Sequence, residues 1–427
     1  MKKTLNRKSI SPVAFLMCAL GIIFYCYEYY LRVAPSVMGA ELRETFGLTE
    51  AAFGYLAAFF YYAYTPMQIP VGMMMDRFGP RRILTFACFI CAVGTYLFAA
   101  TAEIILAHLG RFLVGFGSAF AYVGVLKIAN VWLPKRYFAM MAGICSALGM
   151  LFGAIGGEVS MTYLVARIGW QETVHYSVIA GVLFAVLLWV FLRDSKDDSA
   201  IDHTKSDQYT VKFSRLNEMF LSREMWLNGI IGCLTFLPIS AFAEIWAVGF
   251  LESTGMSKVN AALGSSMVFL GFAVGGPIWG WLSDAIHSRR IPLMVGSFIS
   301  AALFAVAIFF PSSSTIWMFG LLFFAAFFTS AEILVFAVSN DLSRSKVSGT
   351  AIAFTNMVVM VGGGVLPPII GKVLDSSMQV VDNVAVVSSE DYSIALAVLP
   401  LSLFIAGILS LILKESYRKP KKLSEAP

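Results

Sequence analysis

Twelve apolar runs, each long enough to cross a lipid bilayer as a helix, dominate the sequence. The hydrocarbon core of a bilayer is about 30 Å thick, so a crossing helix needs roughly 20 mostly apolar residues. Only 13% of the residues are charged, whereas soluble proteins carry about 25%. We therefore predict an all-α membrane protein with twelve transmembrane helices. They span about 12–34, 51–73, 83–101, 104–130, 138–165, 173–193, 225–251, 259–282, 291–310, 315–339, 348–371 and 393–413.

The basic residues divide unevenly between the two sides of this topology. If both termini are cytoplasmic, three of the 31 Lys and Arg lie within spans, and most of the others lie in cytoplasmic loops and ends. The external loops hold four, which are Arg43, Arg167, Lys258 and Lys372. Cytoplasmic loops of membrane proteins are enriched in Lys and Arg. We therefore predict that both termini are cytoplasmic.

One long polar stretch, from Asp194 to Glu224, interrupts the series of spans. It predicts an N-terminal six-helix bundle at 1–193, a cytoplasmic linker at 194–224, a C-terminal six-helix bundle at 225–413 and a basic cytoplasmic tail at 414–427. The segment VKFSRLNEMFLSREMW, at 211–226, has the pattern of an amphipathic helix on the membrane surface. We expect the first run to stay uncleaved, because no small-residue cleavage site follows it.

The two halves carry the same loop signature. GMMMDRFGPRR occupies Gly72–Arg82 and GWLSDAIHSRR occupies Gly280–Arg290, with the glycine, the aspartate and the arginine pair at identical spacing. Such duplication is typical of transporters built from two six-helix repeats. An aspartate and arginines can form ion pairs at the cytoplasmic ends of helices, so we expect a cytoplasmic gate; the alternative is simple anchoring of the loops. Its expected members are Gly72, Asp76, Arg77, Gly79, Arg81, Arg82, Gly280, Asp284, Arg289 and Arg290.

Seven residues are the strongest candidates for charged side chains inside the predicted spans, where each costs about 3 kcal/mol or more. They are Glu28, Arg32, Arg111, Lys127, Glu158, Glu244 and Glu332. Residues of this kind usually face a cavity and a partner. Four acids beside three bases suit a zwitterion whose carboxylate and ammonium both need partners, or a carboxylate that is carried together with a proton.

The first span places several of its polar residues on one stripe. Positions i, i+3, i+4 and i+7 share one face of a helix, and here they are Tyr25, Glu28, Tyr29 and Arg32. The planar fork of an arginine matches a carboxylate, so Arg32 is predicted to bind a substrate carboxylate. Glu28 would pair with Arg32 in the empty site and take a proton when substrate displaces it. The alternative is a permanent structural pair, with Arg32 reaching toward the outer interface.

The expected substrate site draws on both halves. Its members are Tyr25, Glu28, Tyr29, Arg32, Arg111, Lys127, Glu244, Trp246, Glu332 and Asn356. Proton coupling is expected at three of them, which are Glu28, Glu244 and Glu332. For Trp246 and Asn356 the alternative is helix packing, and for Lys127 it is snorkelling to the cytoplasmic surface. Glu158 lies beside a run of glycines and is interpreted as structural.

These motifs resemble the major facilitator superfamily over all twelve spans. Gly72–Arg82 matches that superfamily's loop between helices 2 and 3, and Arg111–Gly117 resembles its helix 4 pattern, which implies a buried arginine near the substrate cavity. Gly149–Gly157 resembles the helix 5 motif of its drug/proton antiporters. Ala154, however, stands where those antiporters carry proline. We therefore interpret these glycines as a close-packing face, which argues against efflux by antiport.

Longer segments resemble particular branches of this superfamily. YEYYLRVAPSVM and YYAYTPMQIPVGMMMDRFGPRR are similar to the phagosomal amino-acid transporters of intracellular bacterial pathogens. The first segment also partly resembles the anion:cation symporters, which carry sugar acids and other carboxylates. Those symporters usually place an acidic residue directly before the arginine of helix 1, whereas Glu28 and Arg32 are four residues apart here.

Together these features predict a secondary active transporter that works by alternating access. We expect import of an amino acid or a short peptide by proton symport. The alternatives are proton symport of an organic anion, such as a carboxylate or sugar acid, and siderophore or drug transport. A membrane sensor that does not transport is the alternative from a different class.

No motif indicates an enzyme or an ATP-driven pump. The sequence contains no H-E-x-x-H, nucleophile elbow, P-loop or spaced Cys/His cluster, so we expect no enzymatic activity, no cofactor and no metal. The expected partners are a small-molecule substrate, protons as the coupling ion and the lipid bilayer, without nucleic acid. We expect a monomer in the bacterial inner membrane.

Overall fold

The computed structural model describes residues 11–100, 102–134, 137–194, 221–343, 348–381 and 384–417, most of which are helical. The first half contains α1 (Pro12–Val37), α2 (Gly39–Phe46), α3 (Glu50–Phe78), α4 (Pro80–Ala100), α5 (Ile104–Ser118), α6 (Ala121–Trp132), α7 (Phe138–Leu148), the π-helical turn η2 (Gly149–Ile155), α8 (Gly156–Ile168) and α9 (Trp170–Phe191). The predicted amphipathic helix at 211–226 lies mostly outside the described residues.

The second half has a matching series of elements. It contains α11 (Arg223–Leu237), the π-helical segment η4 (Pro238–Trp246), α12 (Ala247–Ser253), α13 (Lys258–Ile286), α14 (Arg290–Phe309), α15 (Thr315–Thr329), the 3₁₀ turn η5 (Ser330–Ile333), α16 (Leu334–Leu342), α17 (Ser348–Ser377), β1 (Gln379–Val381), β2 (Val384–Val386), α18 (Ser389–Leu396) and α19 (Val398–Ile412).

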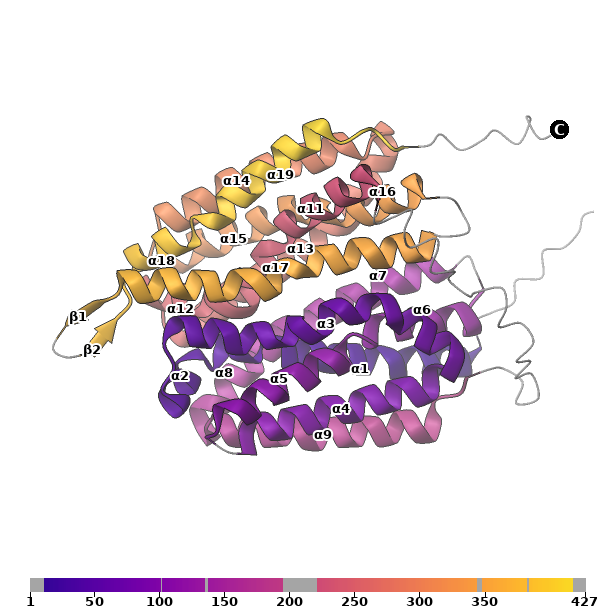
Figure 1. The fold of residues 1–427 in the computed structure, drawn as a ribbon, viewed down its shortest axis with the longest axis horizontal. Coiled ribbons are helices and arrows are strands. Elements are labelled where there is room, and N and C mark those ends of the chain that lie inside the picture. Colours follow the sequence, from indigo (N-terminus) through magenta and orange to yellow (C-terminus); the bar gives the residue numbers. More distant parts are fainter. Residues whose placement is uncertain are drawn as a thin grey trace, which may run out of the picture.

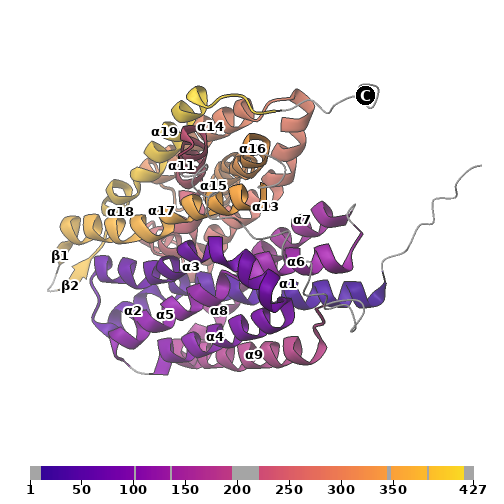
Figure 2. The same ribbon diagram turned by 45° about the vertical axis from the view of Figure 1, so that its right-hand side comes forward.

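The two halves form two helical bundles whose long helices run along the long axis of the molecule (Figure 1). Helices α1–α9 make one bundle and α11–α19 the other, and α17 rests against α3 where the bundles meet (Figures 1 and 2). Helix α2 and the β1–β2 hairpin lie at one end, which we call the hairpin end. The opposite end, where the chain leaves α19, is called the terminal end.

Eleven segments of the described chain are long and apolar enough to cross a membrane, and they match eleven of the predicted runs. The remaining run forms the 29-residue helix α3, which is less apolar because it contains four tyrosines, Gln68 and two prolines. The fold therefore agrees with an all-helical membrane domain. The count of twelve crossings and the cytoplasmic placement of the termini remain predictions.

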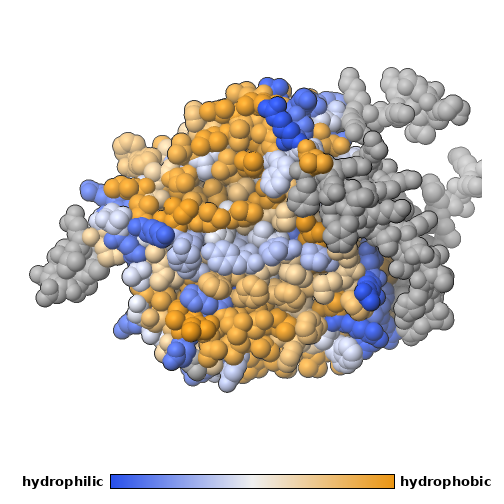
Figure 3. Space-filling view, in the orientation of Figure 1, coloured by the Kyte–Doolittle hydropathy of each residue, from blue (hydrophilic) through white to orange (hydrophobic). Residues whose placement is uncertain are grey.

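Both bundles expose mostly apolar surface between polar ends, and a paler, weakly hydrophilic band runs between them in this view (Figure 3). Hydrophobic residues cover much of both bundles in this view, whereas strongly hydrophilic residues gather toward the hairpin and terminal ends. On α9, Leu183, Val186 and Trp189 are each more than half exposed. A soluble monomer rarely exposes apolar patches this large, but helices that face lipid require them.

A small β-hairpin departs from the all-α prediction. Strands β1 and β2 pair antiparallel, with Val381 opposite Val384, in the connection between α17 and α18. Valine favours the extended conformation, and this connection lies beyond the apolar spans. Hydropathy identifies crossing segments and carries no information about the structure of the loops between them, so this hairpin adds a loop detail to the all-helical membrane fold.

The halves approach each other closely along α3 and α17. A Cβ atom at Gly54 would lie only 2.4 Å from the carbonyl oxygen of Pro367, so this contact requires glycine. Nearer the hairpin end, the Asp375 carboxylate of α17 accepts hydrogen bonds from the backbone amides of Glu50 and Ala51, at 2.7 and 3.0 Å. These amides are unpaired within α3 because they belong to its first turn. The carboxylate of one half therefore caps a helix of the other.

Candidate functional site

A buried cluster of charged side chains lies where α1 meets the second half. Arg32 on α1 is 2% exposed, and its Nη2 donates to both carboxylate oxygens of Glu28 at 3.2 Å each. Its Nη1 lies 3.8 Å from Oε1 of Glu244, on η4. The predicted pairing of Glu28 with Arg32 is therefore confirmed. The alternative, in which Arg32 reaches toward the outer interface, requires an exposed side chain, whereas Arg32 is buried.

Three aromatic rings surround the Arg32 guanidinium. Its Cζ lies 4.6 Å from the ring centroid of Tyr29, 5.0 Å from that of Phe60 and 4.8 Å from that of Tyr64. These cation–π contacts are strong when desolvated, and they orient the guanidinium. The Nε of Arg32 has no hydrogen-bond partner among the described residues, so one donor is available to a bound anion.

Phe60 and Tyr64 were missed by the sequence analysis. They lie on α3 at i and i+4, and Tyr61 and Gln68 extend the polar and aromatic face of this helix toward the second half. The same helical spacing that marked the stripe of the first span would have identified these residues, had it been applied to the second.

Glu244 joins the two halves. Its Oε2 accepts a hydrogen bond from the Tyr61 hydroxyl of α3, while its Oε1 faces Arg32. Glu244 lies on a π-helical segment that begins at Pro238, and such irregular turns occur frequently at functional sites. Glu244 of the second half therefore lies beside the arginine that Glu28 binds.

Arg111 contributes to the same region through the backbone of α1. Its Nη1 donates a 2.9 Å hydrogen bond to the carbonyl oxygen of Leu31. In a regular helix this carbonyl would accept from residue 35, but that residue is proline and has no N–H. Arg111 thus satisfies a carbonyl that Pro35 leaves free, and it holds the turn of α1 that carries Arg32. We interpret it as a positioning residue for the cluster.

This arrangement predicts coupling between Arg111 and Pro35. Replacing Arg111 by alanine leaves a buried carbonyl unpaired, so we expect a loss of about 1–3 kcal/mol in the free energy of unfolding. Adding Pro35→Ala should recover part of that loss, because the alanine supplies the missing N–H. Denaturation of the two single variants and the double variant in detergent measures the coupling. Simply additive losses would contradict this role for Arg111.

The two faces of α1 have different surroundings. A Cβ at Gly149 would lie 2.3 Å from the Tyr25 ring, and one at Gly153 would lie 2.4 Å from Cβ of Tyr29. The glycines of η2 therefore provide the predicted close-packing face. On another side of α1, Tyr27 and Tyr30 help to line an apolar cavity of about 660 Å³ between α1, α7, η2 and α9. This cavity contains none of the charged residues of the cluster.

The structure does not bring Lys127 to the cluster. Lys127 pairs instead with Asp76, which lies near the terminal end of α3, and both side chains are partly exposed. Asn356 of α17 donates to Gln68 of α3 at 2.7 Å. This amide pair links the two halves, as the packing alternative proposed.

Trp246 and Glu332 are buried, and each has a side-chain atom without a hydrogen-bond partner among the described residues. Trp246 packs edge-on against Phe53 with 5.3 Å between ring centroids, and its indole N–H has no partner among the described residues. Glu332 lies on the 3₁₀ turn η5 and is 3% exposed, and its Oε1 likewise lacks a partner there. No ion pair connects Glu332 to Arg32 in the described part of the chain, so its coupling role stays a prediction.

The signature loop of the first half binds its own bundle. The backbone amide of Arg81 donates to Asp194 Oδ1 at 2.7 Å, and its guanidinium Nε donates to the carbonyl oxygen of Trp189 at 2.9 Å. Gly79 has a positive φ of 78°, which favours glycine, and a Cβ there would lie 2.7 Å from Asp194. Asp194 was assigned to the linker by sequence, but it anchors this loop.

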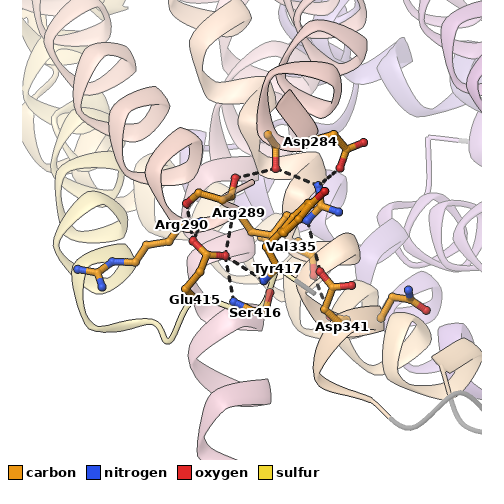
Figure 4. A network of polar contacts seen from close by, with 12 residues as sticks. Asp284, Arg289, Arg290, Val335, Asp341, Glu415, Ser416 and Tyr417 are labelled. Atoms are coloured by element: carbon orange, nitrogen blue, oxygen red, sulfur yellow. Dashed lines mark hydrogen bonds and ion pairs between the residues drawn. The ribbon is translucent and has the colours of Figure 1, made fainter. Parts of the chain in front are cut away.

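The second signature loop is held in the same way by Glu415 (Figure 4). The backbone amides of Arg289 and Arg290 donate to its carboxylate at 2.9 and 3.3 Å. Partial burial raises the pKa of Glu415, but the hydrogen bonds from Ser288 and these amides outweigh it and hold the pKa below its usual value. The stabilisation is therefore present above the ordinary pKa of glutamate and is lost as the pH falls through the lowered value.

The gate aspartates and arginines form ion pairs within their own halves. Arg289 Nη1 lies 2.7 Å from Asp284, and its Nε lies 3.3 Å from Asp341 of α16. The side-chain contacts of Asp76 and Arg81 likewise stay in the first half. A gate that joins the two halves at this end is not formed by these residues in this structure, and it remains a prediction for another state.

Two helical bundles that meet around buried charges are typical of secondary transporters. The chain belongs to the Major Facilitator Superfamily, whose family model matches residues 16–367 and 239–427. The fold is also that of a bacterial homolog of the human lysosomal transporter Spinster, in an inward-facing and unoccupied conformation. The TM-score to it is 0.73 at 18% identity over 95% of this chain and 96% of that one. A D-xylose–proton symporter gives 0.73 at 14% identity over 96% and 99%.

Curated relatives carry the names of anion transporters. The chain is 26% identical to the "Probable sulfoacetate transporter SauU" of Cupriavidus necator, over 83% of this chain and 86% of the relative. It is 25% identical to the "Probable galactarate/D-glucarate transporter GudP" of Bacillus subtilis, over 98% and 96%. These bacterial relatives support a multi-pass inner-membrane transporter. They do not support the expected resemblance to phagosomal amino-acid transporters, which was based on short segments.

Proposed function

We propose that the protein is a proton-coupled transporter of a small organic acid that carries at least one carboxylate. The observation that carries this proposal is Arg32, a buried guanidinium framed by three aromatic rings and held by Glu28 and Glu244. A planar guanidinium binds a carboxylate with two parallel hydrogen bonds. The cluster thus contains a carboxylate receptor that is occupied by the protein's own acids when substrate is absent.

Substrate binding is coupled to proton binding because the substrate carboxylate displaces Glu28 from Arg32. A substrate carboxylate at Arg32 would take the place of Glu28, which would then lie buried without its counter-ion. Since a buried unpaired carboxylate is strongly unfavourable, Glu28 takes a proton when substrate binds. Glu244, which faces both Arg32 and Tyr61, can respond in the same way. Substrate and proton then bind together, as symport requires.

The names of the relatives favour an organic acid over the amino acid or peptide that the sequence first suggested. Sulfoacetate and the sugar acids galactarate and glucarate all carry carboxylates and lack an ammonium group. Zwitterions such as amino acids are the competing class of substrate, because Glu28 or Glu244 can also pair with the ammonium of a zwitterion. We therefore design the test to separate the two classes.

Thermal denaturation of the purified protein, with candidate ligands added, tests the substrate class. We expect galactarate, glucarate or sulfoacetate to raise the melting temperature, since a ligand at about 100 times its Kd stabilises by about 2.7 kcal/mol. Galactitol, which has the carbon skeleton of galactarate without its carboxylates, is the matched control and should have no effect. Stabilisation by amino acids or dipeptides, but by none of the acids, would overturn the proposal.

A further inference from the structure

Another buried carboxylate lies between the two halves, outside the cluster around Arg32. Glu158 on α8 is 0% exposed. Its Oε1 accepts a hydrogen bond from Ser265 Oγ at 2.8 Å, and its Oε2 accepts one from Ser266 Oγ at 3.0 Å. Both serines belong to α13 of the second half, so the acid and its donors come from different bundles. The sequence interpretation of Glu158 as a structural residue did not anticipate this contact.

Glu158 has no cationic partner among the described residues. The charged group that acts on it electrostatically is Glu244, on η4, and it carries the same sign. The Asp, Glu, His, Lys and Arg side chains on α1, α9 and α13, the helices packed against α8, pair with other groups or lie in exposed positions. They are Glu28 and Arg32 on α1, Glu172 and His175 on α9, and Lys258 and Asp284 on α13. An ionised carboxylate here would be uncompensated, which costs several kcal/mol.

The number of hydrogen-bond donors and acceptors around Glu158 also favours its protonated form. Ser265 Oγ lies 3.1 Å from the carbonyl oxygen of Ala243, and Ser266 Oγ lies 2.9 Å from that of Ala262. Each hydroxyl has one hydrogen, so the two serines cannot serve both these carbonyls and both oxygens of Glu158. A proton on Glu158 adds a third donor. One serine can then donate to its carbonyl while it accepts from the acid.

We propose that Glu158, Ser265 and Ser266 form a proton-binding site that holds the halves together toward the hairpin end. The proton comes from water and reaches the Glu158 carboxylate when the halves are apart, giving a neutral acid that the two serines bind as the halves close. Loss of the proton leaves an ionised group in an apolar interface and favours separation. This site goes beyond the proposed function, because its proton acts on the conformational equilibrium and needs no substrate.

The position of the site supports this role. Lys258 pairs with Glu41 across the halves nearer the hairpin end, and Asp375 caps α3 there. Water therefore reaches Glu158 from the hairpin end only after these contacts part. A proton bound in this way is picked up and released on the same side, so it regulates the equilibrium without adding to the protons transported with substrate.

Distance measurements across the hairpin end test this proposal. Spin labels at Ala40→Cys, on α2, and Val259→Cys, on α13, both at exposed positions, report separation of the halves by pulsed electron resonance in nanodiscs without substrate. Wild-type protein treated with the same reagent supplies the background from native cysteines. Between about pH 5 and pH 9, we expect the ratio of separated to closed molecules to rise with pH, by at most about tenfold per pH unit for one proton.

Two variants decide the outcome. In Glu158→Gln the amide stays neutral, so the pH response should be lost and the halves should stay closed, whereas the exposed control Glu172→Gln should behave as the wild type. The double variant Ser265→Ala with Ser266→Ala removes the donors, so it should increase the separated fraction at every pH. A wild-type pH response in Glu158→Gln would overturn the proposal. An unchanged separated fraction in the serine variant would also overturn it, even if Glu158→Gln failed to fold.

Discussion

Replacing Arg32 by lysine is expected to reduce substrate uptake by roughly 100-fold, because an ammonium cannot bind a carboxylate through two parallel hydrogen bonds, and a hydrogen bond to a charged group contributes about 1.5–3 kcal/mol. Lysine keeps the positive charge but loses the planar fork that contacts both oxygens of Glu28 and faces Glu244. It also loses the stacking of a flat cation on the three surrounding rings. The measurement is the initial rate of uptake into proteoliposomes with an imposed pH gradient.

The control for this experiment is Arg167→Lys. Arg167 stacks on Tyr163, with 4.3 Å between its Cζ and the ring centroid, and it lies at an exposed position in the last turn of α8. A substitution there should leave uptake within about twofold of the wild type, since surface changes have small effects. If Arg32→Lys is correctly inserted and transports at the rate of this control, Arg32 is not the carboxylate receptor.

Replacing Glu28 by glutamine is expected to abolish accumulation driven by a pH gradient while leaving exchange of substrate across the membrane intact. Glutamine resembles the protonated acid in shape and is permanently neutral, so it permits binding at Arg32 but cannot exchange a proton. Accumulation under an inward proton gradient and counterflow without a gradient, both in proteoliposomes, measure the two activities separately.

Glu172→Gln is the matched control for this charge removal, because Glu172 lies on α9 with a side chain that is 64% exposed. It should keep both activities. Full pH-driven uptake by Glu28→Gln would show that Glu28 is not the coupling group. If Glu244→Gln lost accumulation in the same assay, coupling would be assigned to the second half.

The two proposals about protons are separable by experiment. The central cluster of Glu28, Arg32 and Glu244 affects how much substrate accumulates, whereas Glu158 affects how often the halves part toward the hairpin end. A Glu158→Gln variant should therefore reach the same final accumulation as the wild type, although its rate changes. The reason is thermodynamic, since only protons that move across the membrane with substrate set the accumulation ratio.

Much of the fold could be predicted because it depends on local patterns. Apolar runs located the spans within a few residues; the first, predicted at about 12–34, forms α1 over Pro12–Val37. Helical spacing placed Tyr25, Glu28 and Arg32 on one face. The repeated loop signature predicted two similar halves, and the structure extends it, because Asp194 and Glu415 hold the two loops in the same way.

The sequence by itself thus determined the membrane class, the helical spans, the duplication and the pairing of Glu28 with Arg32, since hydropathy and the 3.6-residue helical repeat act within a single segment. Only the tertiary structure decided which segments meet. It placed Glu244 beside Arg32, and it paired Lys127 with Asp76 and not with the cluster around Arg32. The physical reason is that contacts between distant helices follow from packing along glycines, prolines and irregular turns, and no local pattern specifies the partner.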